Sequence, residues 1–99
     1  MITASSQKEA LKIKDALLSQ KMAACVNIIK GIDSFFWWEG KIDTAREVLM
    51  LVKTRRKNFQ KIAALVKKLH SYQVPEIIAL PIIAGHKPYL SWLEKETKK

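Results

Sequence analysis

The chain has 99 residues, which is enough for one domain with one hydrophobic core and too few for two. With 48% hydrophobic and 27% charged residues it has the composition of a folded chain, which excludes intrinsic disorder. Its 18 Lys and Arg residues against 9 Asp and Glu give a formal charge of +9, which allows nucleic acid, a membrane surface or an anionic ligand as partner. The lysines are spread along the chain, however, and this spread favours a solvated basic surface. We expect a single domain over residues 1–99.

Cysteine content and hydropathy bear on the compartment. The single cysteine, Cys25, excludes an internal disulfide and fits a reducing environment. No stretch approaches the roughly 20 apolar residues of a membrane span, and the first residues lack the order of a secretory signal. We therefore expect a cytoplasmic protein without membrane contact.

The first third of the chain predicts a strand, a helix and a strand. Met1 to Ala4 can form only the end of a strand, and Ser6-Gln7-Lys8-Glu9 has the pattern of a capping box, in which the serine hydroxyl and the glutamate carboxylate satisfy backbone donors. Apolar residues then recur at helical spacing through about Lys21. Met22 to Ile29 is β-branched toward its end, which predicts a strand that closes in a turn at Gly31.

The segment "SFFWWEGKI" (Ser34 to Ile42) contains four adjacent aromatic residues. We expect it to be extended, with the next turn at Gly40. Each aromatic ring can bury about 150–250 Å², so four exposed rings would exceed the apolar patch of a typical soluble monomer. Glu47 to Thr54, "EVLMLVKT", then has the continuous apolar run of a central strand covered on both faces.

The second half predicts a helix, an edge strand and a final helix. The spacing of Ile62, Leu65, Val66 and Leu69 predicts an amphipathic helix that ends before Val74-Pro75. Ile77 to Ala84 reads as a strand, and its Pro81 confines that strand to an edge or a bulge. Finally, Pro88 suits the first turn of a helix in which Tyr89, Trp92 and Leu93 share a face.

The order of these elements predicts the fold class. A β-α-β-β-α-β order favours an α/β (α+β) ferredoxin-like split βαβ sandwich, with an antiparallel sheet, a long hairpin between the second and third strands, a short first strand and an extra C-terminal helix. Helices on one face leave the other sheet face bare. Since the chain has no second helix layer, we expect another subunit to cover that face.

The sequence lacks the motifs of common enzymes. It has no glycine-rich phosphate loop, no Gly-x-Ser-x-Gly elbow, and no Cys-x-x-Cys or His-x-x-x-His spacing. Cys25 and His70 could pair as nucleophile and base, but a lone cysteine in an apolar strand is far more often inert packing. The aliphatic central strand also lacks the aromatic platform on which single-stranded RNA stacks. We therefore expect neither an enzyme nor a nucleic-acid-binding protein.

Two kinds of site stay open on the residues alone. His70, Cys25 and Glu76 have side chains that suit copper or zinc, although their spacing matches no metal motif. A histidine at a helix end can equally serve a local hydrogen bond. Lys53, His70, Tyr72 and Glu76 all fall at predicted strand and helix ends, which suggests a cleft for a small polar or anionic ligand.

Five segments together resemble the CutA family of divalent-cation tolerance proteins, in order and spacing and over nearly the whole chain from Thr3. They are "AACVNIIKGI" (Ala23 to Ile32), "FFWWEGKI" (Phe35 to Ile42), "EVLMLVKT" (Glu47 to Thr54), "LHSYQVPEIIALPI" (Leu69 to Ile82) and "YLSWL" (Tyr89 to Leu93).

The resemblance implies a cytoplasmic homotrimer linked to tolerance of copper and other divalent metals, with no established enzymatic activity and no obligatory cofactor. It implies a possible copper or other divalent-metal contact at His70 and Cys25. It also implies a pocket between subunits formed by Trp38, Lys53, His70, Tyr72 and Glu76. An alternative is a trimeric, signalling-type regulator that binds a small anionic ligand or a protein partner in that cleft.

The chain departs from the family pattern at several positions. The first strand is nearly absent where relatives carry several more apolar residues, so we expect either a truncated start or a short strand. Ile2 stands where some members have a metal-binding cysteine, and Leu69 stands where some have a second histidine. These two replacements weaken an inherited copper site. Lys30 and Ser71 replace prolines in two turns.

Overall fold

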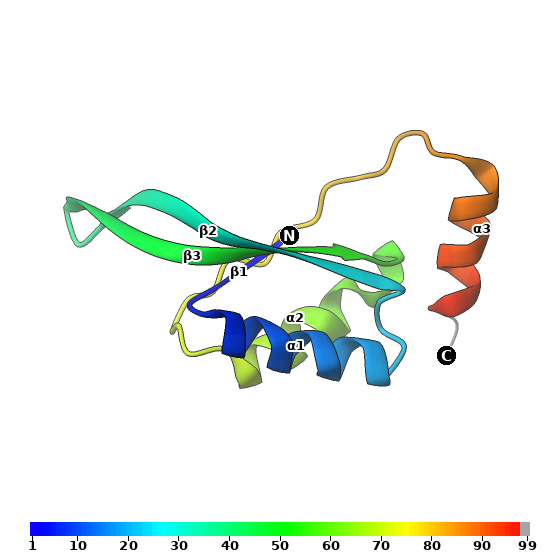
Figure 1. The fold of residues 1–99 in the computed structure, drawn as a ribbon, viewed down its shortest axis with the longest axis horizontal. Helices are drawn as coiled ribbons and strands as arrows, with labels where there is room; N and C mark the ends of the chain where they lie inside the picture. The colour runs from blue at the N-terminus through cyan, green and yellow to red at the C-terminus, as the bar shows by residue number, and fades with distance from the viewer. Residues whose placement is uncertain (98–99) are drawn as a thin grey trace.

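The computed structural model describes residues 1–97. The strands are β1 (Ile2–Ala4), β2 (Cys25–Trp38) and β3 (Lys41–Lys53); the helices are α1 (Gln7–Ser19), the 3₁₀ turn η1 (Arg56–Asn58), α2 (Phe59–Leu69) and α3 (Lys87–Glu96). The sheet is antiparallel with the order β1-β3-β2. Figure 1 shows α1 and α2 beneath one face of this sheet, while α3 stands beyond its end. The predicted α+β class, with β3 as the central strand and an extra C-terminal helix, is confirmed.

The core lies between the sheet and the two helices beneath it. Ala10, Ile13 and Leu17 recur at helical spacing on α1 and are fully buried. Ile62 and Val66 of α2, which lies beside α1 under the same sheet face, are buried in the same layer. The strands contribute buried residues that include Ile2, Ala4, Val48 and Met50. The apolar stripes of both helices therefore face the sheet, as their periodicity predicts. No helix in residues 1–97 is long and apolar enough to cross a membrane.

The β2–β3 hairpin is long and closes in a tight turn. Trp38 pairs with Lys41, so Glu39 and Gly40 alone form the loop, and both have positive φ angles of 50° and 78°. A two-residue hairpin turn with positive φ at both central positions matches the right-handed twist of the flanking strands. The predicted turn at Gly40 is confirmed.

Gly31 does not form the predicted turn. The register passes from Ile29 opposite Leu49 to Ile32 opposite Glu47, so β2 has one residue more than β3 at this point. Gly31, at φ 67°, belongs to a β-bulge, and the strand continues beyond it to Trp38. A glycine in an extended run can accommodate a bulge as well as a turn, and pairing with β3 on both sides selects the bulge here.

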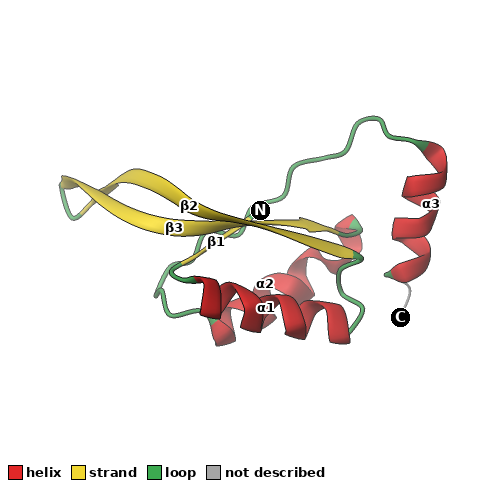
Figure 2. Cartoon of the chain, viewed as in Figure 1, coloured by secondary structure: helices red, strands yellow, loops and turns green. Residues whose placement is uncertain are grey.

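The predicted strand from Ile77 to Ala84 is also wrong within one chain. Ile77 forms an isolated bridge with Ile2, and the Ile78 N–H donates to the Met1 carbonyl, but no further residue up to Ala84 belongs to a strand. The segment is instead a loop that runs beside the sheet toward α3, as Figure 2 shows in green. Its apolar side chains are exposed, Ile83 by 94%.

Helix α2 ends at Leu69, before Val74-Pro75 as predicted. His70 has extended backbone angles (φ −82°, ψ 141°), although its N–H still bonds to the Val66 carbonyl. The His70 ring leaves the helix axis to reach β1. This turn of the chain positions the group of polar residues described next.

Candidate functional site

His70 joins the end of α2 to β1 and α1. Its side chain is completely buried, and its Nε2–H donates to the Thr3 carbonyl over 2.7 Å. The other ring nitrogen, Nδ1, lies 3.0 Å from the Tyr72 backbone N–H and 3.0 Å from Glu9 Oε1. In the neutral ring Nδ1 accepts from the Tyr72 N–H, whereas in the protonated ring Nδ1–H donates to Glu9. Both nitrogens therefore have protein partners in either state.

Glu9 is the acidic partner that the sequence did not reveal. Its carboxylate accepts hydrogen bonds from the Ser5 hydroxyl over 2.6 Å and the Ser71 hydroxyl over 2.7 Å, in addition to its contact with His70. Burial alone would raise the pKa of this carboxyl, but these hydrogen bonds and the nearby His70 together lower it. Glu9 is thus held as a carboxylate.

The position of Glu9 corrects half of the predicted capping box. The Ser6 hydroxyl does accept from the Glu9 N–H at the start of α1. The Glu9 carboxylate, however, turns inward to the serines and His70. The sequence holds a signal for this orientation, since Glu9, Ile13 and Leu17 are spaced by four residues and so lie on one helix face. An acid on the buried stripe of a helix indicates an internal partner.

Tyr72 connects this group to the central strand. Its hydroxyl donates to Glu47 Oε2 over 2.8 Å, and its ring packs against the His70 ring with centroids 4.8 Å apart. Burial and the hydrogen bond to the Glu47 carboxylate raise the pKa of Tyr72 to about 12. Glu47 itself is only 7% exposed. It is the second acid that the sequence analysis did not single out. We refer to Glu9, Glu47, His70 and Tyr72 as the His70 cluster.

The His70 cluster ties four parts of the chain together through polar bonds. It joins α1, β1, β3 and the loop after α2, and no buried polar side-chain atom of residues 1–97 lacks a partner. Within the same residues, no three His, Cys, Asp or Glu side chains converge as a metal-binding group. A metal ion at His70 would have to displace the Thr3 carbonyl, or Glu9 and the Tyr72 N–H. The metal role of His70 stays a prediction.

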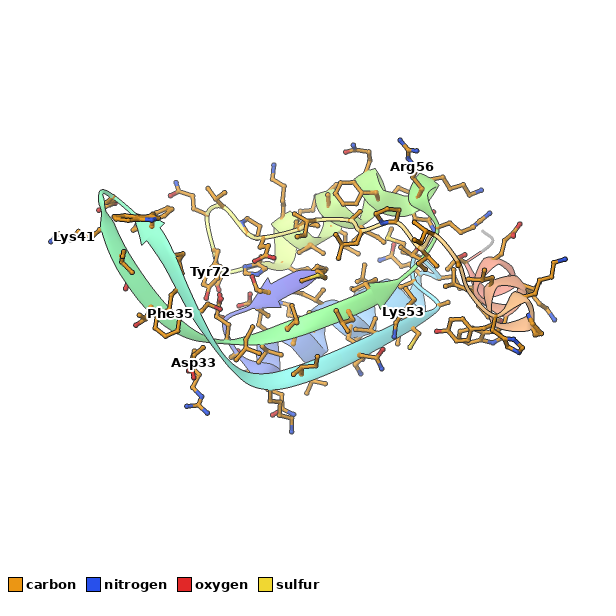
Figure 3. The ribbon with its side chains drawn as sticks, turned by 90° about the horizontal axis from the view of Figure 1, so that it is seen from above. Asp33, Phe35, Lys41, Lys53, Arg56 and Tyr72 are labelled. Atoms are coloured by element: carbon orange, nitrogen blue, oxygen red, sulfur yellow. The ribbon has the colours of Figure 1, made fainter. Side chains whose placement is uncertain are left out.

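Cys25 and Lys53 lie at a separate place in the fold. They face each other at the ends of β2 and β3, where the Lys53 ammonium donates to Asn27 Oδ1 and the half-buried Cys25 thiol lies 3.9 Å from the same oxygen. Thr3, whose carbonyl accepts the hydrogen bond from His70, pairs with Leu49, which precedes Lys53 by four residues on β3. At about 3.3 Å per residue that is roughly 13 Å along the strand. One chain therefore does not bring Cys25 to His70, and Figure 3 shows Lys53 well away from Tyr72.

Trp38 is far from Lys53 in one chain. Trp38 pairs with Lys41 at the hairpin turn and is half exposed, whereas Lys53 ends the same hairpin at the other side of the sheet. Twelve residues of strand separate Lys41 from Lys53, or about 40 Å. Glu76 is exposed next to the bridge residue Ile77. A pocket that contains Trp38 and Lys53 together needs residues from more than one chain.

The fold and site define a class of protein: a small ferredoxin-like α+β domain, with two helices under one sheet face, a protruding hairpin and a polar cluster where β1 meets the end of α2. Residues 1–96 match the family model described as CutA1 divalent ion tolerance protein. The chain belongs to the CutA1 family.

Relatives from several kingdoms support this assignment. The divalent-cation tolerance protein CutA of Archaeoglobus fulgidus is 51% identical over 94 residues, which are 95% of this chain and 91% of that protein. Its counterpart in Thermus thermophilus is 45% identical over 97 residues, 98% of this chain and 94% of that protein. The solved Thermus thermophilus structure superposes with a TM-score of 0.96 over 98% of this chain and 94% of that chain.

Length and naming differ among the relatives. The rice protein CutA 1 is 42% identical over 98 residues, which are 99% of this chain but 55% of that protein. The chain thus spans about half the length of its plant relative and nearly all of the two microbial ones. The rice protein is named chloroplastic, and the Archaeoglobus fulgidus structure is described as a periplasmic protein.

Proposed function

We propose that this chain forms a homotrimer that acts in tolerance of divalent metal ions, copper among them, by weak metal binding and without catalysis. The observation that carries the proposal is the match of residues 1–96 to the divalent ion tolerance family. The near full-length relatives of Thermus thermophilus and Archaeoglobus fulgidus bear the same description in their names. The proposed location is the cytoplasm, where the free thiol of Cys25 stays reduced. Fractionation of cells that express the full-length protein tests that location.

The exposed apolar surface supports self-association. Phe35 and Trp37 on the hairpin are each 72% exposed, and Leu80 and Ile83 of the following loop are 68% and 94% exposed. Side chains of this size, gathered on a hairpin and on an unpaired extended segment, favour association. Residues 79–84 also offer unpaired backbone groups that a strand from another chain could pair with.

The predicted pocket supports the same assembly. Trp38 and Lys53 lie at opposite ends of the hairpin, so a pocket that includes both would combine the hairpin turn of one subunit with the strand ends of another. The ligand pocket of Trp38, Lys53, Tyr72 and Glu76 is therefore proposed as an intersubunit site.

Sedimentation equilibrium tests the assembly. We expect a trimer at micromolar concentration, and we expect Trp37→Ala to shift the equilibrium toward monomer because it removes a large exposed ring from the hairpin. Leu11→Ala is the matched control, since Leu11 is a partly exposed apolar residue on α1. A stable wild-type monomer would refute the trimer.

Calorimetric titration tests the metal site. Copper(I) and copper(II) are titrated into the wild type, Cys25→Ala, His70→Ala and the control His86→Ala, which alters the other histidine of the chain. We expect weaker binding in the first two variants and wild-type binding in the control. Because His70 also holds β1, circular dichroism must show that His70→Ala is folded. Unchanged affinity in both Cys25→Ala and His70→Ala would remove these residues from the site.

A second candidate function is a trimeric regulator that binds a small anionic ligand or a protein partner in the intersubunit cleft. The placement of the Lys53 ammonium at a strand end favours an anion there. A thermal-shift screen of anionic metabolites discriminates between the two functions, because a specific ligand raises stability with its concentration. A Lys53→Ala variant that responds to the same ligand as the wild type would argue against this cleft.

A further inference from the structure

The cations are spread along the chain, but the net positive charge is concentrated in one segment that has no acidic residue. Between Glu47 and Glu76 the sequence has no acidic residue, yet it holds seven of the 18 Lys and Arg residues. These are Lys53, Arg55, Arg56, Lys57, Lys61, Lys67 and Lys68. Five of them, Arg56 to Lys68, belong to η1 and α2. The excess of positive over negative residues is therefore largest in and around η1 and α2.

The outer side of α2 presents a row of ammonium groups to solvent. Ile62 and Val66 point to the core and fix the inner side of the helix. Lys57, Lys61 and Lys68 are spaced by four and seven residues, so they lie on one face opposite to that inner side. Ala64 lies between them, and all four residues are exposed. We call Arg56, Lys57, Lys61, Lys67 and Lys68 the α2 basic face.

Within residues 1–97, no acidic side chain forms an ion pair with the α2 basic face. In the part of the chain that the structure describes, the ion pairs are Lys14 with Asp15, Lys21 with Glu96, and His70 with Glu9. None of them includes a cation of η1 or α2. Figure 3 shows Arg56 at the start of this segment, at the margin of the molecule.

Lys67 and Lys68 lie in the last turn of α2, where cations favour the helix dipole, but the cations at the start of the helix do not stabilise it. The first turn of α2 contains no acid, and the cations Arg56 and Lys57 precede it directly, where the helix dipole favours negative charge. Lys57 and Lys61 are one turn apart, and like charges at that spacing repel. An external anion that bound along this face would relieve both effects.

We propose that the α2 basic face binds the phosphate backbone of a nucleic-acid duplex, without sequence specificity. Charge complementarity selects a polyanion, and the absence of apolar side chains larger than alanine on the outer face leaves nothing to insert into a lipid bilayer. A single strand would need exposed aromatic rings for base stacking, and the α2 basic face has none. The sequence-based expectation against nucleic acid concerned stacking on the sheet, whereas this contact uses the opposite, helical layer.

The dimensions of the face fit several phosphates. Arg56 and Lys68 are twelve residues apart, or about 18 Å along a helix. A duplex carries one negative charge per roughly 1.7 Å of its axis, so this length of duplex has enough phosphates for each of the five cations to contact one. If all five engage, the logarithm of the binding constant falls with the logarithm of salt concentration with a slope of about −4.5. Binding then weakens about 500-fold between 50 and 200 mM salt.

The test measures duplex binding by fluorescence anisotropy over a salt series. The probe is a labelled 20-base-pair duplex of mixed sequence. The variant Lys57→Gln/Lys61→Gln/Lys68→Gln removes three cations from the α2 basic face. The control Lys30→Gln/Lys87→Gln/Lys95→Gln removes three exposed cations from β2 and α3. Both variants have the same net charge, and circular dichroism and sedimentation check their fold and assembly.

We expect a salt slope near −4.5 for the wild type and for the control, and a slope near −1.8 for the α2 variant. The α2 variant should also bind at least 10-fold more weakly at 50 mM salt. An equal loss of duplex affinity in both variants would overturn the proposal, because total charge and not the α2 basic face would then determine the affinity. It is also overturned if the wild type binds phosphatidylserine vesicles but no duplex at 50 mM salt, or if it does not bind the duplex at all.

Discussion

Replacing Glu9 tests whether its partly buried carboxylate stabilises the His70 cluster by joining α1 to Ser5 and to the loop after α2. In Glu9→Gln the amide oxygen can still accept from the Ser5 and Ser71 hydroxyls, and His70 Nδ1 still accepts from the Tyr72 N–H. What is lost is the negative charge that strengthens the two short bonds of 2.6 and 2.7 Å. A hydrogen bond to a charged group contributes about 1 kcal/mol more than a neutral one, so we expect a loss of about 2 kcal/mol in the free energy of unfolding.

Glu9→Ala should cost more. It leaves the Ser5 and Ser71 hydroxyls without their shared acceptor and removes the acid beside His70, for which we expect a loss of about 3 kcal/mol. The control is Asp15→Asn, which removes a carboxylate from the same helix. Its side chain is 72% exposed and paired only with Lys14, so the cost should stay below about 1 kcal/mol.

The assay is urea unfolding at one fixed protein concentration, since association makes apparent stability depend on concentration. The contribution of Glu9 to stability should also depend on pH. The pKa of Glu9 is lowered by folding from its ordinary value of 4.5, so its contribution is complete above that pH and is lost as pH falls through the lower, folded-state pKa. Wild type should therefore lose more stability below pH 4.5 than Glu9→Gln does. Equal stability of Glu9→Gln, Asp15→Asn and wild type at pH 7, with parallel acid profiles, would refute the role of Glu9.

Three further outcomes are expected. Met50→Ala, which empties a fully buried site in the central strand, should lower the free energy of unfolding by about 2–5 kcal/mol in urea, and a loss below 1 kcal/mol would contradict the core as described. Tyr72→Phe should remove the tyrosinate absorbance step at about pH 12 from an ultraviolet titration, and an unchanged curve there would show that this step does not belong to Tyr72. Gly40→Ala should cost about 1 kcal/mol in thermal unfolding, because alanine is strained at φ 78°, and a variant as stable as wild type would indicate a different hairpin turn.

The elements that could be predicted from the sequence are those whose pattern is local. The spacing of Ile13 and Leu17, and of Ile62 and Val66, fixes which side of each helix is buried, and the structure confirms both. The turn at Gly40 follows from local conformational preference in the same way. Such features are determined by residues that are close together in the sequence.

Features that depend on a distant partner could not be predicted. The bulge at Gly31 exists because β3 pairs on both sides of it. The segment after Ile77 has the composition of a strand, yet strand formation requires a neighbour that one chain does not provide. Glu9 and Glu47 take their roles from His70 and Tyr72, which lie 61 and 25 residues away in the sequence. The site was therefore only partly foreseen.

The double pairing of β1 sets an order for folding during synthesis. The β2–β3 hairpin joins segments that are adjacent in the chain, so it can form as soon as Lys53 has left the ribosome. Ile2, by contrast, pairs with Met50 on one side and with Ile77 on the other. Strand β1 is thus made before both of its neighbours, and it gains the second one only after Ile77 has been synthesised.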